Sequence, residues 1–297
     1  MRIFDPHIHM TSRTTDDYEA MAAAGVRAVV EPSFWLGQPR TGVDSFCDYF
    51  DALLGWEPFR ASQFGVQHFA TIGLNPKEAN DPRCTPVLDL LPRYLAKDRV
   101  VAVGELGYDS LTREEEHAFR TQLHLAVEHG LPALVHTPHR DKLTGTRRTL
   151  SVVEQVGIDP GRVLVDHLNE VTVADVAASG CWMGFSIYPD TKMDEHRMVR
   201  ILSEHGLSRM IVNSAADWGR SDPLKTVRTA QAMLAAGFSD DDVDRVLWRN
   251  PVEFYSQSGR LDLVDVDGAD ATIDLTATFE GNSVLRGARP DAVQGRV

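Results

Sequence analysis

The chain has 297 residues, of which 43% are hydrophobic and 25% are charged, and this composition is typical of a globular protein. Its formal net charge of −13 disfavours a nucleic-acid-binding surface, which requires clustered lysine and arginine, and no apolar run approaches the roughly 20 residues that span a bilayer. The N-terminus also lacks the basic segment and apolar core of a signal peptide, and the cysteines lie far apart, so we expect a cytoplasmic protein.

Short apolar runs follow one another along the chain, and an amphipathic stretch separates each run from the next. Most of these runs are continuously apolar, which is typical of parallel strands that are buried on both faces. We therefore predict strands within residues 2–9, 26–33, 66–76, 100–109, 131–139, 163–169, 181–189 and 209–218.

Helices are predicted between the apolar runs from their start and stop signals. The segment 112–130 has an acidic first turn and ends at a glycine. The segments 193–206 and 223–237 also end at glycine, and a further helix is predicted over 239–255.

The repeated strand-then-helix pattern predicts a single (β/α)8 TIM barrel over residues 1–258, followed by a C-terminal extension over residues 259–297. A doubly wound open sheet is the main alternative, but its first turn is usually glycine-rich, whereas the first turn here reads DPHIHMTSR. Because Phe279, Val284 and Leu285 are apolar, we expect the extension to pack back on the barrel.

Polar residues gather at the C-terminal ends of the predicted strands, where barrel enzymes build their active sites. One polar residue in such a position says little, since every strand must end, but repeated imidazoles and carboxylates at one rim indicate a site. The residues at this rim are His7, His9, Glu31, Asn75, Glu105, Asp109, His136, His139, Asp166, His167, Asn169, Ser186, Tyr188, Asn213, Ser214 and Asp217.

A metal site is predicted from part of this set. His7 and His9 are two residues apart, so on a strand both side chains point to the same side. Such a pair is commonly coincidental when it stands alone. Imidazoles and carboxylates from four other strands join it here, and these donors suit zinc, manganese, iron or cobalt. Since six ligands exceed what one catalytic ion takes, we expect two divalent ions that share a bridging ligand.

The sequence resembles the TatD-like metal-dependent hydrolases of the amidohydrolase superfamily over roughly residues 1–258. The motifs that carry the resemblance are HIH, GELGYD, VHTPH, DHLN and the aspartate of SAADW, which occur in this order. The resemblance implies that Glu105 bridges two metal ions. It implies that the metal ligands are His7, His9, Glu105, His136, His167 and Asp217.

Two motifs depart from the pattern of this family. Asn75 stands in IGLNPKEAND, where TatD-like proteins often carry histidine before proline, and the last motif is NSAADWG instead of Glu-Thr-Asp with a nearby proline. Both departures leave the metal ligands in place and bear on the substrate. They indicate a divergent branch and not a housekeeping deoxyribonuclease.

Further residues are candidates for contacts around the metal site. Glu31 is expected either to accept a hydrogen bond from His7 or His9 or to start a helix. His139 is expected either to contact substrate or to lie in a solvated loop, and Trp218 either to line the pocket or to pack. The candidates for substrate or ligand contacts are Glu31, His139, Asn169, Tyr188, Asn213 and Trp218.

Three classes of function remain open at this point. The first is a hydrolase that uses a metal-bridging hydroxide, with Asp217 as the proton relay, on a small ester, amide, lactone or phosphoester. The second is a non-haem diiron monooxygenase that hydroxylates a small organic molecule with the same ligands. The third, a non-catalytic scaffold, is disfavoured because it would not need six donors at one rim. We expect a small-molecule substrate and neither nucleic-acid nor membrane partners, and the oligomeric state stays open.

Overall fold

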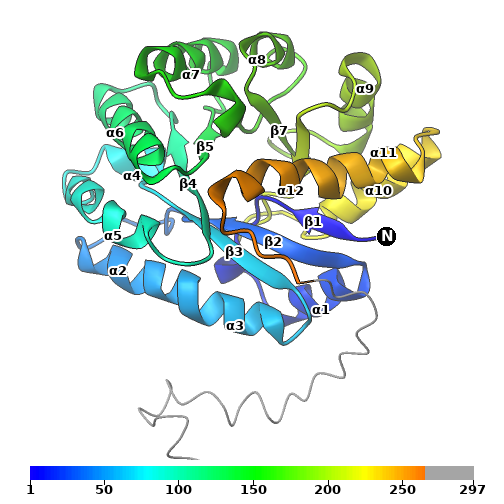
Figure 1. Cartoon of the computed structure of the whole chain (residues 1–297), viewed down its shortest axis with the longest axis horizontal. Helices are drawn as coiled ribbons and strands as arrows, with labels where there is room; N and C mark the ends of the chain where they lie inside the picture. The colour runs from blue at the N-terminus through cyan, green and yellow to red at the C-terminus, as the bar shows by residue number, and fades with distance from the viewer. Residues whose placement is uncertain (265–297) are drawn as a thin grey trace, which may run out of the picture.

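The computed structural model describes residues 1–264, in which parallel strands form one eight-stranded sheet in consecutive order, β1 to β8. Helices surround these strands, as Figure 1 shows, so the predicted (β/α)8 barrel is confirmed. The strands are β1 (Ile3–Asp5), β2 (Val26–Pro32), β3 (Gln67–Ile72), β4 (Val100–Gly107), β5 (Ala133–His136), β6 (Val163–Val165), β7 (Trp182–Ser186) and β8 (Met210–Asn213).

The outer layer consists of helices that begin and end on local signals. The longest of those predicted begins after Thr112, whose side chain forms a capping box with Glu115, and ends at Gly130 in the left-handed conformation. The helices are α1 (Thr15–Ala23), α2 (Asp44–Asp51), α3 (Glu57–Ser62), α4 (Pro76–Ala79), α5 (Leu91–Leu95), α6 (Arg113–His129), α7 (Lys142–Val156), α8 (Val173–Ser179), α9 (Glu195–His205), α10 (Lys225–Ala235), α11 (Asp240–Asp244) and α12 (Asn250–Tyr255).

Several strands end earlier than the apolar runs predicted. Strand β6 stops at Val165 and β8 at Asn213, so the polar residues that follow lie in loops at the barrel mouth. His167 has a φ of 61°, which is left-handed, and a strand cannot continue through that conformation. Polar residues such as His167 and Asp217 are therefore loop residues, whereas Glu105 lies on β4 and His136 is the last residue of β5.

Main-chain hydrogen bonds between loops join the first and last strands at the mouth. The amide of Ala215 donates to the carbonyl of His7 at 2.9 Å, and the amide of His9 donates to the carbonyl of Ala216 at 2.9 Å. These bonds place the two histidines beside the loop that follows β8.

The opposite end of the barrel interior is apolar. Inward-facing side chains from the strands pack there against Phe254 and Tyr255 of α12, which lies near the N-terminus in Figure 1. The hydroxyl of Tyr255 also donates to the carbonyl of Pro6 at 2.8 Å. This end of the barrel interior is a packed apolar core.

The C-terminal extension is described only up to Val264. Arg260 donates to the carbonyls of Leu95 and Lys97, and Leu261 packs against the apolar end of the barrel. The prediction for Phe279, Val284 and Leu285 falls outside the described residues. Among residues 1–264, no helix combines the length and apolar character needed to cross a membrane.

Candidate metal centre

The two histidines after β1 lie side by side and are buried. Their Nε2 atoms are 3.1 Å apart, and the ring of His9 stacks on Phe34 with a centroid distance of 3.7 Å. His7 uses its other nitrogen, Nδ1, to donate to Asp166 Oδ2 at 2.6 Å. This bond leaves Nε2 of His7 as the atom that faces the cavity with a lone pair.

Glu105 lies at the centre of the site, between two glycines that its position requires. A Cβ on Gly104 would meet the carbonyl of Leu134, and a Cβ on Gly107 would meet the carbonyl of His136. Both glycines also have positive φ, which side chains disfavour. The GELG motif therefore lets β4 approach β5 closely enough to bring Glu105 to the imidazoles that follow β5 and β6.

Both oxygens of the Glu105 carboxylate accept hydrogen bonds from neighbouring side chains. Its Oε1 accepts from His136 Nδ1 at 2.7 Å and from His167 Nε2 at 3.0 Å, and its Oε2 accepts from Asn75 Nδ2 at 2.8 Å. Burial raises the pKa of this carboxyl, but the charge of His136 and the hydrogen bonds hold the pKa well below its usual value. Asn75, one of the two departures from the family pattern, thus contacts the predicted bridging residue.

Five of the six predicted ligands form two groups of potential metal donors that share Glu105. Within each group the donor atoms lie within 4.8 Å of one another. The two groups that share Glu105 are His7, His9 and Glu105, and Glu105, His136 and His167; a third group in the described residues joins His7 and His167 to Asp166.

Asp217 lies in the wall of the same cavity and outside both donor groups. Its Oδ1 accepts from the hydroxyl of Tyr188 at 3.0 Å and from the amide of Gly219 at 2.7 Å. Its role as a ligand therefore stays a prediction.

The donors fit divalent cations by their chemistry and by their unused atoms. His9 Nδ1 and His136 Nε2 are buried without a hydrogen-bond partner in the described part of the chain. Burial lowers the pKa of His9 well below its usual value, and the charge of His7 lowers it further. Burial and the charge of Lys192 lower the pKa of His167 in the same way. Neutral imidazoles beside an ionised carboxylate are the ligands that zinc, manganese and iron take.

The residue that orients His7 is Asp166, which we placed at the rim but not among the metal ligands or the candidates for contacts around them. Asn213 Nδ2 in turn donates to both carboxylate oxygens of Asp166 at 3.1 Å. Burial raises the pKa of Asp166, but the charge of His167 and the bond from His7 hold the pKa below its usual range. The sequence signal was an aspartate directly before a predicted ligand, in VDHLN.

The expected contact of Glu31 with His7 or His9 is wrong in this geometry. Its carboxylate accepts from the amide and hydroxyl of Thr11 at 2.7 and 2.9 Å and pairs with His68 Nε2 at 2.8 Å. Glu31 is buried at the same rim, but its side chain points toward β3 and not toward the metal donors.

The cavity above the donors has a volume of about 310 Å³ and also contains His139 and Tyr188, as expected. Asn169, Asn213 and Trp218 do not line it, but Trp218 packs, which is one of its two expected roles, and Asn213 contacts Asp166, the residue that orients His7. Asn213 is buried behind Asp166, Asn169 accepts from the amide of Val171, and the 47%-exposed Trp218 packs behind Phe34. Each contact turns the side chain away from the cavity.

Two lysines in this cavity were not predicted. Lys142 begins α7, and Lys192 lies in the loop between β7 and α9. Burial, and then the charge of Lys192, lower the pKa of Lys142 to about 7, and burial also lowers the pKa of Lys192. Lysines at such positions are usually solvated, so no pattern in the sequence indicates that these two line the cavity.

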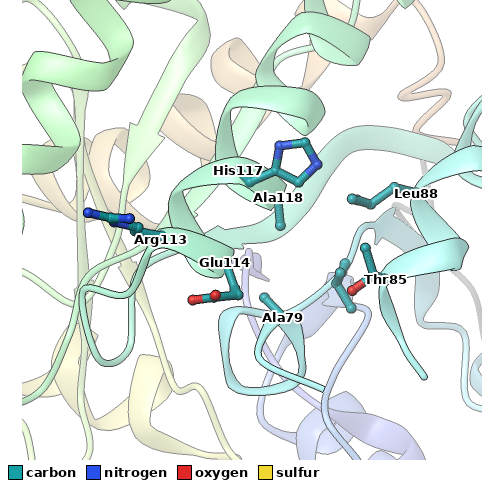
Figure 2. Close-up of a pocket in the computed structure, with 8 residues that line it drawn as sticks. Ala79, Thr85, Leu88, Arg113, Glu114, His117 and Ala118 are labelled. Atoms are coloured by element: carbon teal, nitrogen blue, oxygen red, sulfur yellow. The ribbon is translucent and has the colours of Figure 1, made fainter. Parts of the chain in front are cut away.

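A second hollow, of about 230 Å³, lies between α6 and the segment that contains α4. Figure 2 shows its wall, with His117 and Ala118 of α6 facing Ala79, Thr85 and Leu88. It shares no lining residue with the cavity above the donors. The potential metal donors line the cavity at the barrel mouth, and we assign the functional site to that cavity for this reason.

Comparison with known proteins gives matches over most of the chain. The family model described as TatD related DNase matches residues 4–256. An uncharacterized metal-dependent hydrolase of Methanocaldococcus jannaschii is 26% identical over 257 residues, which cover 85% of this chain and 99% of that protein.

Three solved structures illustrate the similarity of this chain to proteins with the same fold. A TatD-like protein of Archaeoglobus fulgidus has a TM-score of 0.71 and 26% identity, over 85% of this chain and 99% of its own. A phosphotriesterase homology protein of Escherichia coli, solved with phosphate in its active site, has a TM-score of 0.65 and 16% identity, over 86% and 98%. A lactonase of Listeria monocytogenes has a TM-score of 0.62 and 16% identity, over 86% and 94%. The last two show similarity of fold alone.

Proposed function

This chain belongs to the TatD-related DNase family, and on that premise we propose that it is a metal-dependent hydrolase of a small molecule, with two divalent ions at the barrel mouth. The observation that carries the proposal is the position of Glu105, which is shared by two groups of potential metal donors. The description of the Methanocaldococcus jannaschii relative as a metal-dependent hydrolase supports the same class of reaction.

The proposed ligands divide between two ions. His7, His9, Glu105 and Asp217 would hold one ion, and Glu105, His136 and His167 would hold the other. When bound, such ions act as Lewis acids that lower the pKa of water and polarise the oxygen of the bond to be cleaved.

The protein side chains contribute orientation and proton transfer. Asp166 fixes the ring of His7 so that Nε2 faces the cavity, and Asn75 fixes the carboxylate of Glu105. Asp217, like Asp109, is a partly exposed carboxylate in the cavity wall, and Tyr188 holds one of its oxygens. We assign to Asp217 the acceptance of a proton from the attacking water and its delivery to the leaving group.

The size of the cavity supports a small substrate. A volume of about 310 Å³ is at the lower end of the range for small-molecule sites, roughly 300–1,000 Å³. It would admit an ester, amide, lactone or phosphoester with one ring, and the acidic net charge of −13 agrees with a substrate other than nucleic acid.

No observation favours the diiron monooxygenase expected as the alternative, and no named relative is described as an oxygenase. The test is to remove metal with a chelator and then to add back zinc, manganese or ferrous iron under nitrogen. We expect hydrolysis of at least one substrate in a panel of small esters, lactones and phosphoesters, with full recovery on metal addition and no need for dioxygen. Activity only with iron, together with stoichiometric oxygen uptake, would contradict the hydrolase and favour the oxygenase.

A further inference from the structure

Two lysines line the cavity without an acidic partner. Lys142 Nζ donates to the hydroxyl and carbonyl of Thr137 at 3.0 and 3.1 Å and to the carbonyl of His167 at 2.9 Å, all of which are neutral acceptors. Lys192 Nζ lies 2.9 Å from Nδ1 of His167. Within residues 1–264 neither lysine is within 4.0 Å of a carboxylate oxygen.

The third lysine of the cavity provides a contrast. Lys77 is exposed and still forms an ion pair with Asp109 at 2.9 Å. A cation that is withdrawn from water without a counter-ion loses solvation free energy that neutral acceptors recover only in part. The two partnerless lysines are the more enclosed ones, so the arrangement is the reverse of what stability alone would select.

The lysines lie on one side of the mouth. Lys142 follows β5, Lys192 follows β7, and both contact His167, which follows β6. Because the strands are consecutive around the sheet, the two ammonium groups occupy one arc formed by β5, β6 and β7.

Aromatic side chains occupy another arc of the mouth. Phe34 and Trp35 follow β2 and line the cavity, and Trp218, which follows β8, packs behind them at centroid distances of 4.7 and 5.4 Å. Phe34 stacks on His9, so this wall adjoins the donors that follow β1. The shared Glu105 lies on β4, outside both arcs.

We propose that Lys142 and Lys192 form a binding subsite for an anionic group of the substrate, while Phe34 and Trp35 bind its planar apolar part. The substrate class is then a small hydrolysable molecule with one ring and a carboxylate or phosphate that is not itself cleaved. This assignment rests on the proposed hydrolase function for the reaction, but the binding of the anion depends on the lysines. The bond to be cleaved would lie over the metal donors, away from the anionic group.

The subsite can be tested by equilibrium binding without turnover. Benzoate, phenylphosphonate and benzyl alcohol share one ring and differ in charge, and calorimetry measures their affinity for the full chain before and after zinc loading. We expect the wild type to bind at least one of the two anions tenfold or more tightly than benzyl alcohol. Tighter binding of benzoate would indicate a carboxylate substrate, and tighter binding of phenylphosphonate a phosphorylated one.

Variants then assign the preference to the lysines. In Lys142→Met/Lys192→Met we expect the preference for the anion over the alcohol to fall at least tenfold, both with and without zinc. Lys97→Met makes the same change on the exposed surface, and we expect this variant to keep the wild-type preference for the anion over benzyl alcohol. Circular dichroism verifies that each variant is folded. The single variant Lys192→Arg, which keeps Lys142 and a positive charge at residue 192, is expected to retain part of the preference for the anion.

Two results would contradict the proposal that the two lysines form an anion-binding subsite. One is a wild type that binds the anions no better than benzyl alcohol in either form, and the other is a folded double variant that keeps the full preference. A protein that takes up no zinc but still binds the anion through the lysines would contradict the proposed hydrolase and leave the subsite supported.

Discussion

The two ends of the barrel interior are built from the same strands and differ in chemistry. On β5 the inward side chain changes from Leu134 at the closed end to His136 at the mouth, and on β8 it changes from Ile211 to Asn213. Residues two apart on a strand share a face, so the change occurs within one step of the pleat. The closed end gains its stability from apolar packing, whereas the mouth keeps buried polar atoms without partners. This difference indicates where substitutions should affect folding and where they should affect binding.

The largest expected effect on stability belongs to the closed end. Phe254 is fully buried, and its ring lies 4.9 Å from that of Tyr255 and 5.7 Å from that of Trp182. Phe254→Ala should lower the free energy of unfolding by about 3–5 kcal/mol, because it removes apolar contacts and leaves a cavity. Denaturant unfolding measures this loss.

The same variant should keep its metal content and its activity per folded molecule. Val252→Ala, which shortens a half-buried residue of the same helix, is the control and should lose less stability. Loss of metal from folded Phe254→Ala would break the separation between the two ends.

A smaller effect on free energy, confined to the mouth, is expected for Asp166→Asn. The amide cannot accept from His7 with the strength of a carboxylate, so the imidazole is less well oriented. Metal affinity should fall about 10–100-fold, as for other residues that orient a ligand. Competition with a chelator of known affinity measures the change.

Asp109→Asn is the matched control, because Asp109 lines the same cavity but pairs with Lys77. It should alter metal affinity much less than Asp166→Asn. Equal losses in the two variants would mean that the charge of the cavity, and not the orientation of His7, sets the affinity.

The sequence predicted the barrel, the family and the shared rim because these depend on local patterns. An apolar run and its polar end can be recognised within about ten residues of sequence. The motifs HIH and GELGYD then place potential metal donors at the C-terminal ends of predicted strands. The eight strands and the family are confirmed. Five of the six predicted ligands lie in groups of potential metal donors, and Asp166, which was not predicted as a ligand, lies in one of these groups as well.

The errors concern contacts between distant strands. Glu31 and Asp166 are both buried carboxylates at one rim, and no local pattern shows that His7 contacts the residue 159 positions away. Asn169 and Trp218 were placed by their distance from a strand end, but a loop can turn either side chain away from the cavity, and Asn213, the last residue of β8, is buried behind Asp166. Lys142 and Lys192 reach the cavity through long, flexible side chains, and their burial depends on tertiary packing alone.

The most direct test of the two-metal centre is the number of ions per folded chain in the wild type, in Glu105→Gln and in Glu31→Gln. Elemental analysis after reconstitution should give about two ions for the wild type. Glu105→Gln should hold one ion or fewer and lose hydrolysis, since both donor groups include this carboxylate. Glu31→Gln makes the same change at a buried glutamate outside those groups and should keep both ions. A folded Glu105→Gln variant with two ions and full activity would contradict the account.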